Sequence, residues 1–251
     1  MDRFFNTWAK HPIMSPQSVH YGCVISGLFF VVLFVVGAAA GGFIRPLPPY
    51  WSASQVSQYY RGHEQGIQAG AAMFSFAGML YLPPTAVISA QMRRIPSVHY
   101  VASALQLASG ASAASALLLL GTILAVTGFR LDRPIEITQA LNDFFFIALL
   151  LAWPPYMIQS FAFAYAIIID CRPKPLFPKF LAMINLIAPV LFIPTTAVHT
   201  VKTGPLAWNG AISWWIPLAA FGLQFAFILI LLVRAISSMR DEALPTQIVT
   251  I

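Results

Sequence analysis

Six long runs of apolar residues constrain this chain more than any other feature of its sequence. They lie at about 21–44, 66–92, 101–129, 137–169, 180–200 and 208–235. A helix rises about 1.5 Å per residue, so roughly 20 apolar residues cross a hydrocarbon core about 30 Å thick. We therefore predict an all-α fold: a polytopic integral membrane protein whose bundle of six transmembrane helices forms a single domain over residues 1–251.

The composition excludes the main alternatives to a membrane protein. Hydrophobic residues make up 59% of the chain and charged residues 9%, whereas a soluble domain is roughly 25% charged. Disordered chains are poor in aromatic residues, and this chain is 14% aromatic. The basic residues that give the net charge of +6 lie between the apolar runs and do not form a basic stripe. We therefore predict the lipid bilayer as a partner and no binding of nucleic acid.

Basic residues in the short connections predict the orientation of the helices. Six spans place both termini on one side, and that side carries nine Lys and Arg against five on the other. The two sets are Arg3, Lys10, Arg93, Arg94, Arg172, Lys174, Lys179, Arg234 and Arg240, against Arg45, Arg61, Arg130, Arg133 and Lys202. Basic residues favour the cytoplasmic side, so we expect cytoplasmic termini in a plasma membrane. We also expect a retained first span and a flexible C-terminal tail over 241–251.

The outer loop over 45–65 is the one connection with room for structure of its own. It begins RPLPPYW, which favours an extended backbone because proline restricts its own backbone angles and those of the residue before it. Ser52 then predicts the N-terminus of a short interfacial helix with Val56, Tyr59 and Tyr60 on one face.

Ionisable residues near the outer face are the candidates for chemistry, because a polar group inside a bilayer is costly and therefore points to function. Asp143 and Glu136 are seven residues apart, so they share one face of a helix, and His199 ends the fifth run on the same side of the membrane. These three are candidate acid–base residues. The plainer alternative is that the carboxylates favour the positive end of a helix dipole and that His199 is an interfacial histidine. The remaining candidates are ligand-binding residues: Arg61, His63, Glu64, Asn142, Tyr156, Gln159 and Asn209. No metal-ligand spacing such as HExxH occurs, and we predict neither a metal nor a cofactor.

Prolines inside the apolar runs predict kinked helices around a cavity. The sequence has Pro83-Pro84, Trp153-Pro154-Pro155, Pro189, Pro194 and Pro217. Each proline removes a backbone hydrogen bond, and the freed carbonyl needs a partner in protein or water. We expect a mid-membrane cavity near Tyr156 and Gln159, lined by Trp, Tyr, Phe and Met.

Small and polar residues predict how the helices contact one another. The Gly37–Gly41 GxxxG and the 109–115 segment SGASAAS favour close helix packing, and a homo-oligomer is a weaker alternative to packing within the chain. We expect Gln91 and Gln106 to hydrogen-bond across helices. The segment from Asp170 to Pro175 predicts a rigid turn. We expect a structural ion-pair cluster at this turn, made by Gln91, Arg93, Arg94, Asp170 and Arg172. Cys23 and Cys171 are expected to be free thiols.

Four segments, YRGHEQGIQAG, ITQALND, KPLFPKF and TGPLAWNG, resemble those of a bacterial six-span membrane family without a known activity. The resemblance implies the fold and a bacterial inner membrane but no chemistry. Three functions stay open from the residues alone. The first is binding or translocation of a small, mostly apolar molecule in the kinked-helix cavity. The second is an enzyme acting on a sterol- or isoprenoid-like substrate, and the third is an accessory subunit of a membrane complex without chemistry of its own.

Overall fold

The computed structural model describes residues 11–239, and within that range the chain is helical with no strand. The α-helices are α2 (Pro16–Ala40), α3 (Ala53–Gly62), α4 (Glu64–Met92), α5 (Tyr100–Phe129), α6 (Ile135–Leu151), α7 (Trp153–Ile169), α8 (Lys179–Val190) and α9 (Ile216–Ser237). Shorter elements are the 3₁₀ helices η1 (Pro12–Met14) and η2 (Ile193–His199) and the π-helix η3 (Ala211–Trp215). Arg3, Lys10, Arg240 and the 241–251 tail, on which part of the orientation argument rests, lie outside the described residues.

Within residues 11–239, six helical stretches are long and apolar enough to cross a membrane, which confirms the predicted number of candidate spans. They are Pro16–Ala40, Glu64–Met92, Tyr100–Phe129, Ile135–Ile169, Lys179–His199 and Ala211–Ser237. The first begins earlier than expected because Ser15 caps it and Pro16 occupies its first turn. It also ends earlier, at Ala40, because Gly42 takes a φ of 71° that breaks the helix.

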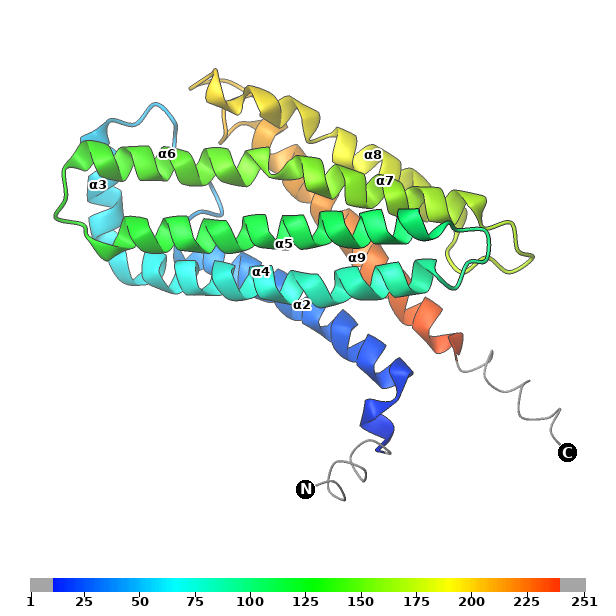
Figure 1. Ribbon diagram of the computed structural model, residues 1–251. Coiled ribbons are helices and arrows are strands. Elements are labelled where there is room, and N and C mark those ends of the chain that lie inside the picture. Colours follow the sequence, from blue (N-terminus) through cyan, green and yellow to red (C-terminus); the bar gives the residue numbers. More distant parts are fainter. Residues whose placement is uncertain (1–10, 240–251) are drawn as a thin grey trace, which may run out of the picture.

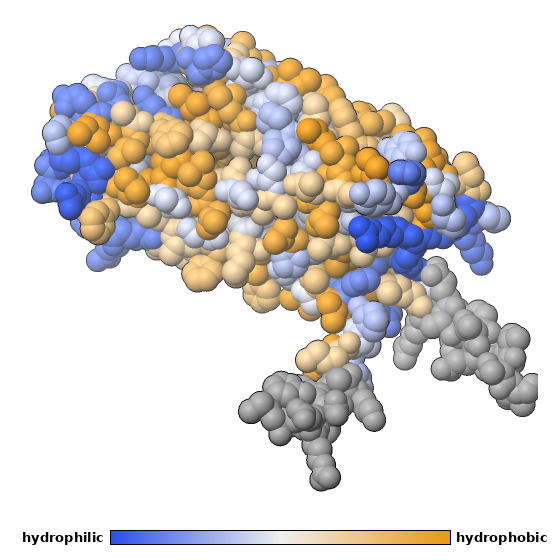
Figure 2. All heavy atoms as spheres, in the orientation of Figure 1, coloured by the Kyte–Doolittle hydropathy of each residue, from blue (hydrophilic) through white to orange (hydrophobic). Residues whose placement is uncertain are grey.

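The spans form an elongated bundle in which α4, α5 and the α6–α7 pair run along the long axis, while α2 and α9 cross it obliquely (Figure 1). One end carries α3 and the connections at 130–134 and 200–210, and we call it the α3 end. The other carries the connections at 93–99 and 170–178, and we call it the Asp170 end. Hydrophilic residues gather at both ends, and hydrophobic residues cover the surface between them (Figure 2). This is the pattern expected of a chain that contacts lipid around its middle.

Small residues bring α4 close to both of its main neighbours. A methyl group at Gly78 would lie 2.8 Å from the backbone nitrogen of Leu118 in α5. On the other side, a methyl at Gly37 of α2 would lie 3.0 Å from the Cβ of Met73. The prediction that the GxxxG segment makes tight helix contacts within the chain is therefore confirmed.

The predicted helix of the outer loop is confirmed as α3. Ser52 accepts a hydrogen bond from the Gln55 N–H, and the Gln55 side chain accepts one from the Ser52 N–H, which makes a complete capping box. The buried face of α3 carries Val56, Ser57 and Tyr60, and it packs against α6. The apolar side of α3 thus contacts protein, and only Tyr59 of the expected face stays partly exposed.

Candidate functional site

The kink expected at Trp153-Pro154-Pro155 is a break at Ala152, between α6 and α7, and a cavity lies beside it. Pro154 and Pro155 have no N–H and their rings disfavour helix in the preceding residues, so the two segments are separate helices. The cavity has a volume of about 140 Å³. Its walls come from α2, α4, α5, the α6–α7 junction, the α8–η2 connection, η3 and α9: Phe30, Phe34, Tyr81, Ala113, Leu117, Leu149, Leu150, Ala152, Trp153, Tyr156, Phe192, Trp214, Pro217, Leu218 and Phe221. We call it the junction cavity.

The junction cavity is lined by apolar side chains apart from the hydroxyls of Tyr81 and Tyr156 and the indole N–H groups of Trp153 and Trp214. The lining contains Trp, Tyr and Phe as predicted, but the expected methionine is absent from it. Met79 of α4 and Met183 of α8 are exposed on the surface instead. Leu218 also lines the cavity and is 39% exposed, so the cavity adjoins the lipid-facing surface of α9.

Carbonyls freed by the prolines find hydroxyl partners on neighbouring helices. The Leu150 carbonyl accepts a hydrogen bond of 2.9 Å from the fully buried Thr195 of η2. In the same way, the Leu80 carbonyl, four residues before Pro84, accepts one of 2.9 Å from Ser26 of α2. These bonds let a broken helix and a proline-containing helix exist in an apolar interior.

A network of buried amides and hydroxyls lies next to the junction cavity, toward the Asp170 end. Tyr81 donates to Gln159 Oε1 at 2.8 Å, and Gln159 Nε2 donates to Thr85 Oγ1 at 3.2 Å. Thr85 in turn donates to the carbonyl of Tyr81 at 3.1 Å. This half of the network therefore links α4 to α7 with each of these side chains partnered.

The second half of the network links α7, α8 and α9. The Tyr156 hydroxyl donates to Gln224 Oε1. Gln224 Nε2 donates to Asn185 Oδ1 at 2.8 Å and to Ser160 Oγ at 3.0 Å. The sequence prediction included Tyr156 and Gln159 but missed Gln224 and Asn185. The sequence signal that could have revealed these two residues is that each is an isolated amide side chain within an apolar run.

A small cavity of about 20 Å³ lies within this network, and Gln106 of α5 lines it. Gln106 is 0% exposed, and neither its Oε1 nor its Nε2 has a hydrogen-bond partner. The prediction that Gln91 hydrogen-bonds across helices is confirmed by its bond to His20 of α2. The same prediction for Gln106 is wrong, because the network amides nearest this cavity already bond one another.

At the α3 end, the structure brings together part of the predicted acid–base group. The buried Asn142 accepts a hydrogen bond from Tyr60 at 3.3 Å and donates one to Asp143 Oδ1 at 3.2 Å. Burial raises the pKa of Tyr60, and the nearby Tyr59 and Asp143 raise it further, so the phenol stays protonated and donates. Lys202 contributes positive charge to the surroundings of the half-buried Asp143.

The other predicted residues of this end lie apart from the junction cavity, and Asp143 does not line it either. Glu136 and His199 are exposed. His63 stacks on Tyr59 with ring centroids 4.1 Å apart, and Arg61 donates to the Leu131 carbonyl at 3.0 Å. Glu64 accepts a bond from Gln68 on the surface of α4, and Asn209 is partly buried. Within residues 11–239, no three His, Cys, Asp or Glu side chains come together in a way that could hold a metal ion.

Two tryptophans close the α3 end above the cavity. Trp208 donates to the Leu47 carbonyl at 2.6 Å, and Trp214 donates to the Ile44 carbonyl at 3.1 Å. Trp208 also stacks on Phe146, with ring centroids 5.6 Å apart. These contacts fix the extended 43–51 segment across the end of the bundle.

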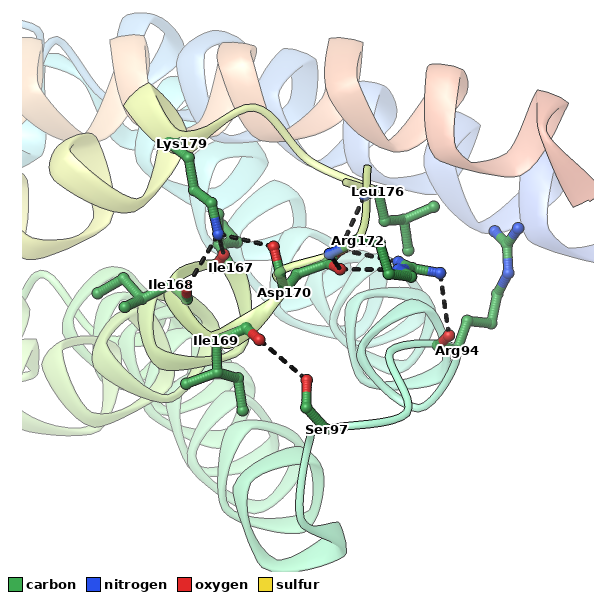
Figure 3. Close-up of polar contacts among 9 residues, drawn as sticks. All are labelled: Arg94, Ser97, Ile167, Ile168, Ile169, Asp170, Arg172, Leu176 and Lys179. Carbon is green, nitrogen blue, oxygen red and sulfur yellow. Dashed lines mark hydrogen bonds and ion pairs between the residues drawn. The ribbon is translucent and has the colours of Figure 1, made fainter. Parts of the chain in front are cut away.

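At the Asp170 end, the ion pair between Asp170 and Arg172 is confirmed as part of the predicted cluster, and Arg172 reaches the backbone carbonyl of Arg94 (Figure 3). Asp170 accepts hydrogen bonds from Arg172 Nε at 2.7 Å and from the Leu176 N–H at 2.9 Å. The Arg172 guanidinium is the main reason that the pKa of Asp170 is held down to about 2. Lys179 donates to the carbonyls of Ile167, Ile168 and Asp170, and so caps the end of α7. This cluster fixes the α7–α8 connection, and both cysteines are free as expected.

Comparison with protein-family models, with curated proteins and with solved structures finds no match to this chain. The site is therefore interpreted from its own residues.

Proposed function

We propose that this chain binds a small, mostly apolar molecule in the junction cavity, and that the molecule enters from the lipid. The observation that carries the proposal is a 140 Å³ cavity, walled by aromatic and aliphatic side chains and placed beside a buried polar network. A dry apolar cavity of about 150 Å³ binds benzene in another protein. The junction cavity is thus large enough for one ring or a branched hydrocarbon of similar size.

The energy available for binding follows from the cavity volume. At about 24 cal/mol per Å³, an empty cavity of this size costs about 3 kcal/mol. A molecule that fills the space restores the lost dispersion contacts. A molecule that is too small recovers only part of that energy, so the cavity favours ligands by size.

The surroundings of the cavity favour entry from the side. Leu218 lines it and is 39% exposed, which places one wall at the lipid-facing surface. The α3 end is covered by the 43–51 segment and its bonds to Trp208 and Trp214. This arrangement supports binding from the bilayer more than passage to the α3 end.

The enzyme alternative uses Asp143, Glu136 and His199 as acid–base groups. The binding proposal is preferred because none of these three residues lines the junction cavity, and Glu136 and His199 are exposed. The Tyr60–Asn142–Asp143 chain of hydrogen bonds favours chemistry at the α3 end. So does an open cavity there that Arg61, His63 and Glu64 line. An accessory subunit would bind a partner protein and no small molecule.

The test fills the cavity from α5 and compares the result with a matched variant one residue away. Leu117 lines the cavity, whereas its neighbour Leu118 is 50% exposed on the lipid-facing side. We expect toluene or methylcyclohexane to raise the melting temperature of wild-type protein and of Leu118→Trp in detergent, but not that of Leu117→Trp. At a free concentration of 100 Kd, the stabilisation is about 2.7 kcal/mol. Equal shifts in all three proteins would mean that the hydrocarbon acts through the micelle and would refute the proposal.

A further inference from the structure

Gln106 is the one fully buried amide side chain in the described bundle whose oxygen and nitrogen are both without partners. An unsatisfied polar group inside protein costs about 1–3 kcal/mol, and more where lipid replaces water. In native structures, a buried polar group without a partner in the protein is hydrogen-bonded by a water molecule or a ligand. Gln106 therefore needs a hydrogen-bond partner from outside the protein.

The space beside Gln106 limits the size of that group. The small cavity measures about 20 Å³, and roughly 10–15 Å³ is enough for one water-sized group. A methyl added at Gly110, one turn along α5, would lie 2.8 Å from Gln159 Nε2. The absence of a side chain at Gly110 therefore lets α5 approach the network closely, and what remains open is space for a single hydroxyl-sized group.

The charge of the site limits its chemistry. No Asp, Glu, Lys, Arg or His lines the small cavity, whose polar groups are amides and hydroxyls. An ion would find no opposite charge there, and burying an unpaired ion is far more costly than burying a neutral polar group. The matching group is neutral and both donates and accepts a hydrogen bond, as the two atoms of the Gln106 amide require.

The small cavity and the junction cavity are neighbours. Tyr81, Tyr156 and Phe221 line both of them. Both tyrosine hydroxyls are already bonded to network amides, to Gln159 and Gln224. A molecule that reaches from the junction cavity to the unpaired amide would therefore pass beside these two tyrosines.

We infer that Gln106 is the specificity-determining residue for the ligand of the junction cavity, and that it recognises a neutral hydroxyl at one end of an otherwise apolar molecule. This inference rests on the proposed function. It narrows the ligand class to small lipophilic alcohols, including phenols, and excludes pure hydrocarbons and ions as preferred ligands. A hydroxyl of this kind fills the small cavity while the hydrocarbon body fills the larger one.

The test compares two probes of nearly the same shape, cyclohexanol and methylcyclohexane, by the ligand-dependent rise in melting temperature. Wild-type protein is expected to bind cyclohexanol about tenfold more tightly, which is the contribution of one well-placed buried hydrogen bond. In Gln106→Met the preference disappears while methylcyclohexane binds as before, because methionine has a similar length and no amide. Gln68→Met, on the exposed face of α4, is the matched control and keeps the preference.

The other possible outcomes overturn either the inference about Gln106 or the proposed function. If methylcyclohexane binds but wild-type protein shows no preference, or if Gln106→Met keeps the preference, the inference about Gln106 is overturned and the amide is satisfied by a water molecule. If neither probe binds wild-type protein, the proposed function itself fails, and the inference with it. Loss of folding in Gln106→Met is not expected, since replacing an unpaired buried polar group by an apolar one is neutral or stabilising.

Discussion

Thr195 provides a direct test of how the helix break beside the cavity is stabilised. Its single hydroxyl proton is shared between the Leu150 carbonyl at 2.9 Å and the Phe192 carbonyl of its own turn at 2.7 Å. Pro154 has no N–H to offer the Leu150 carbonyl. Thr195→Val keeps the shape of the side chain and removes the donor. The Leu150 carbonyl then stays buried without a partner, because Thr195 is 0% exposed and Leu150 is 6% exposed.

The expected cost of Thr195→Val is about 1–2 kcal/mol. The lower part of that range lies within the measured values for hydrogen bonds between membrane helices, which average about 0.6 kcal/mol and reach about 1.7 kcal/mol. The upper part reflects the penalty of an orphaned buried acceptor. The assay is reversible unfolding in mixed micelles with increasing denaturing detergent, monitored by tryptophan fluorescence.

The matched control is Thr196→Val on the next residue. Thr196 is exposed, and its hydroxyl bonds only the Ile193 carbonyl of its own turn, so we expect a cost below about 0.5 kcal/mol. A second arm combines Thr195→Val with Pro154→Ala, which restores an N–H four residues after Leu150. The cost of Thr195→Val should fall in that background. If Thr195→Val costs no more than Thr196→Val, or if its cost is unchanged in the Pro154→Ala background, the explanation of the break is wrong.

Two further predictions concern the connection at the Asp170 end and the packing of α2 on α4. The pKa of Asp170 is lowered to about 2 in the folded protein, so its stabilisation is complete above about pH 4 and is lost as the pH falls toward 2. Between pH 6 and pH 2.5 we expect the free energy of unfolding to fall by about 1–2 kcal/mol in melting experiments. This fall is absent in Asp170→Asn and is retained when the exposed Asp132 is replaced by asparagine as a control. Gly66→Ala would place a methyl against the backbone carbonyl of Ala40, and we expect about 1–3 kcal/mol of destabilisation by detergent titration. Gly222→Ala, whose added methyl has no neighbour within 4 Å, should be neutral or slightly stabilising, and equal effects at both glycines would contradict the packing described.

Local signals in the sequence predicted the local structure well. Ser52 predicts the N-terminus of α3, where the structure forms a capping box. Trp153-Pro154-Pro155 predicts a kink, which the structure forms as the break at Ala152. Both depend on residues within one turn of each other, so they can be inferred without knowing how the helices pack.

Contacts between helices were harder to predict, because they depend on how each helix is rotated about its axis. An amide in an apolar run is expected to find a partner on another helix. Gln224 and Asn185 do so, but the unpaired Gln106 does not. At the α3 end, Asp143 is partly buried beside its sequence neighbour Asn142, yet Glu136 faces the surface. An acid–base role for the α3-end residues stays a prediction.

The central claim is that the junction cavity holds a small lipophilic molecule, and native mass spectrometry of protein purified from its own membranes tests it most directly. The account predicts a bound neutral molecule, with one hydroxyl and a hydrocarbon body of about one ring, on wild-type protein and on Leu118→Trp, and its absence from Leu117→Trp. Equal retention of the same molecule by both tryptophan variants, or an empty wild-type protein purified together with a partner subunit, would contradict it.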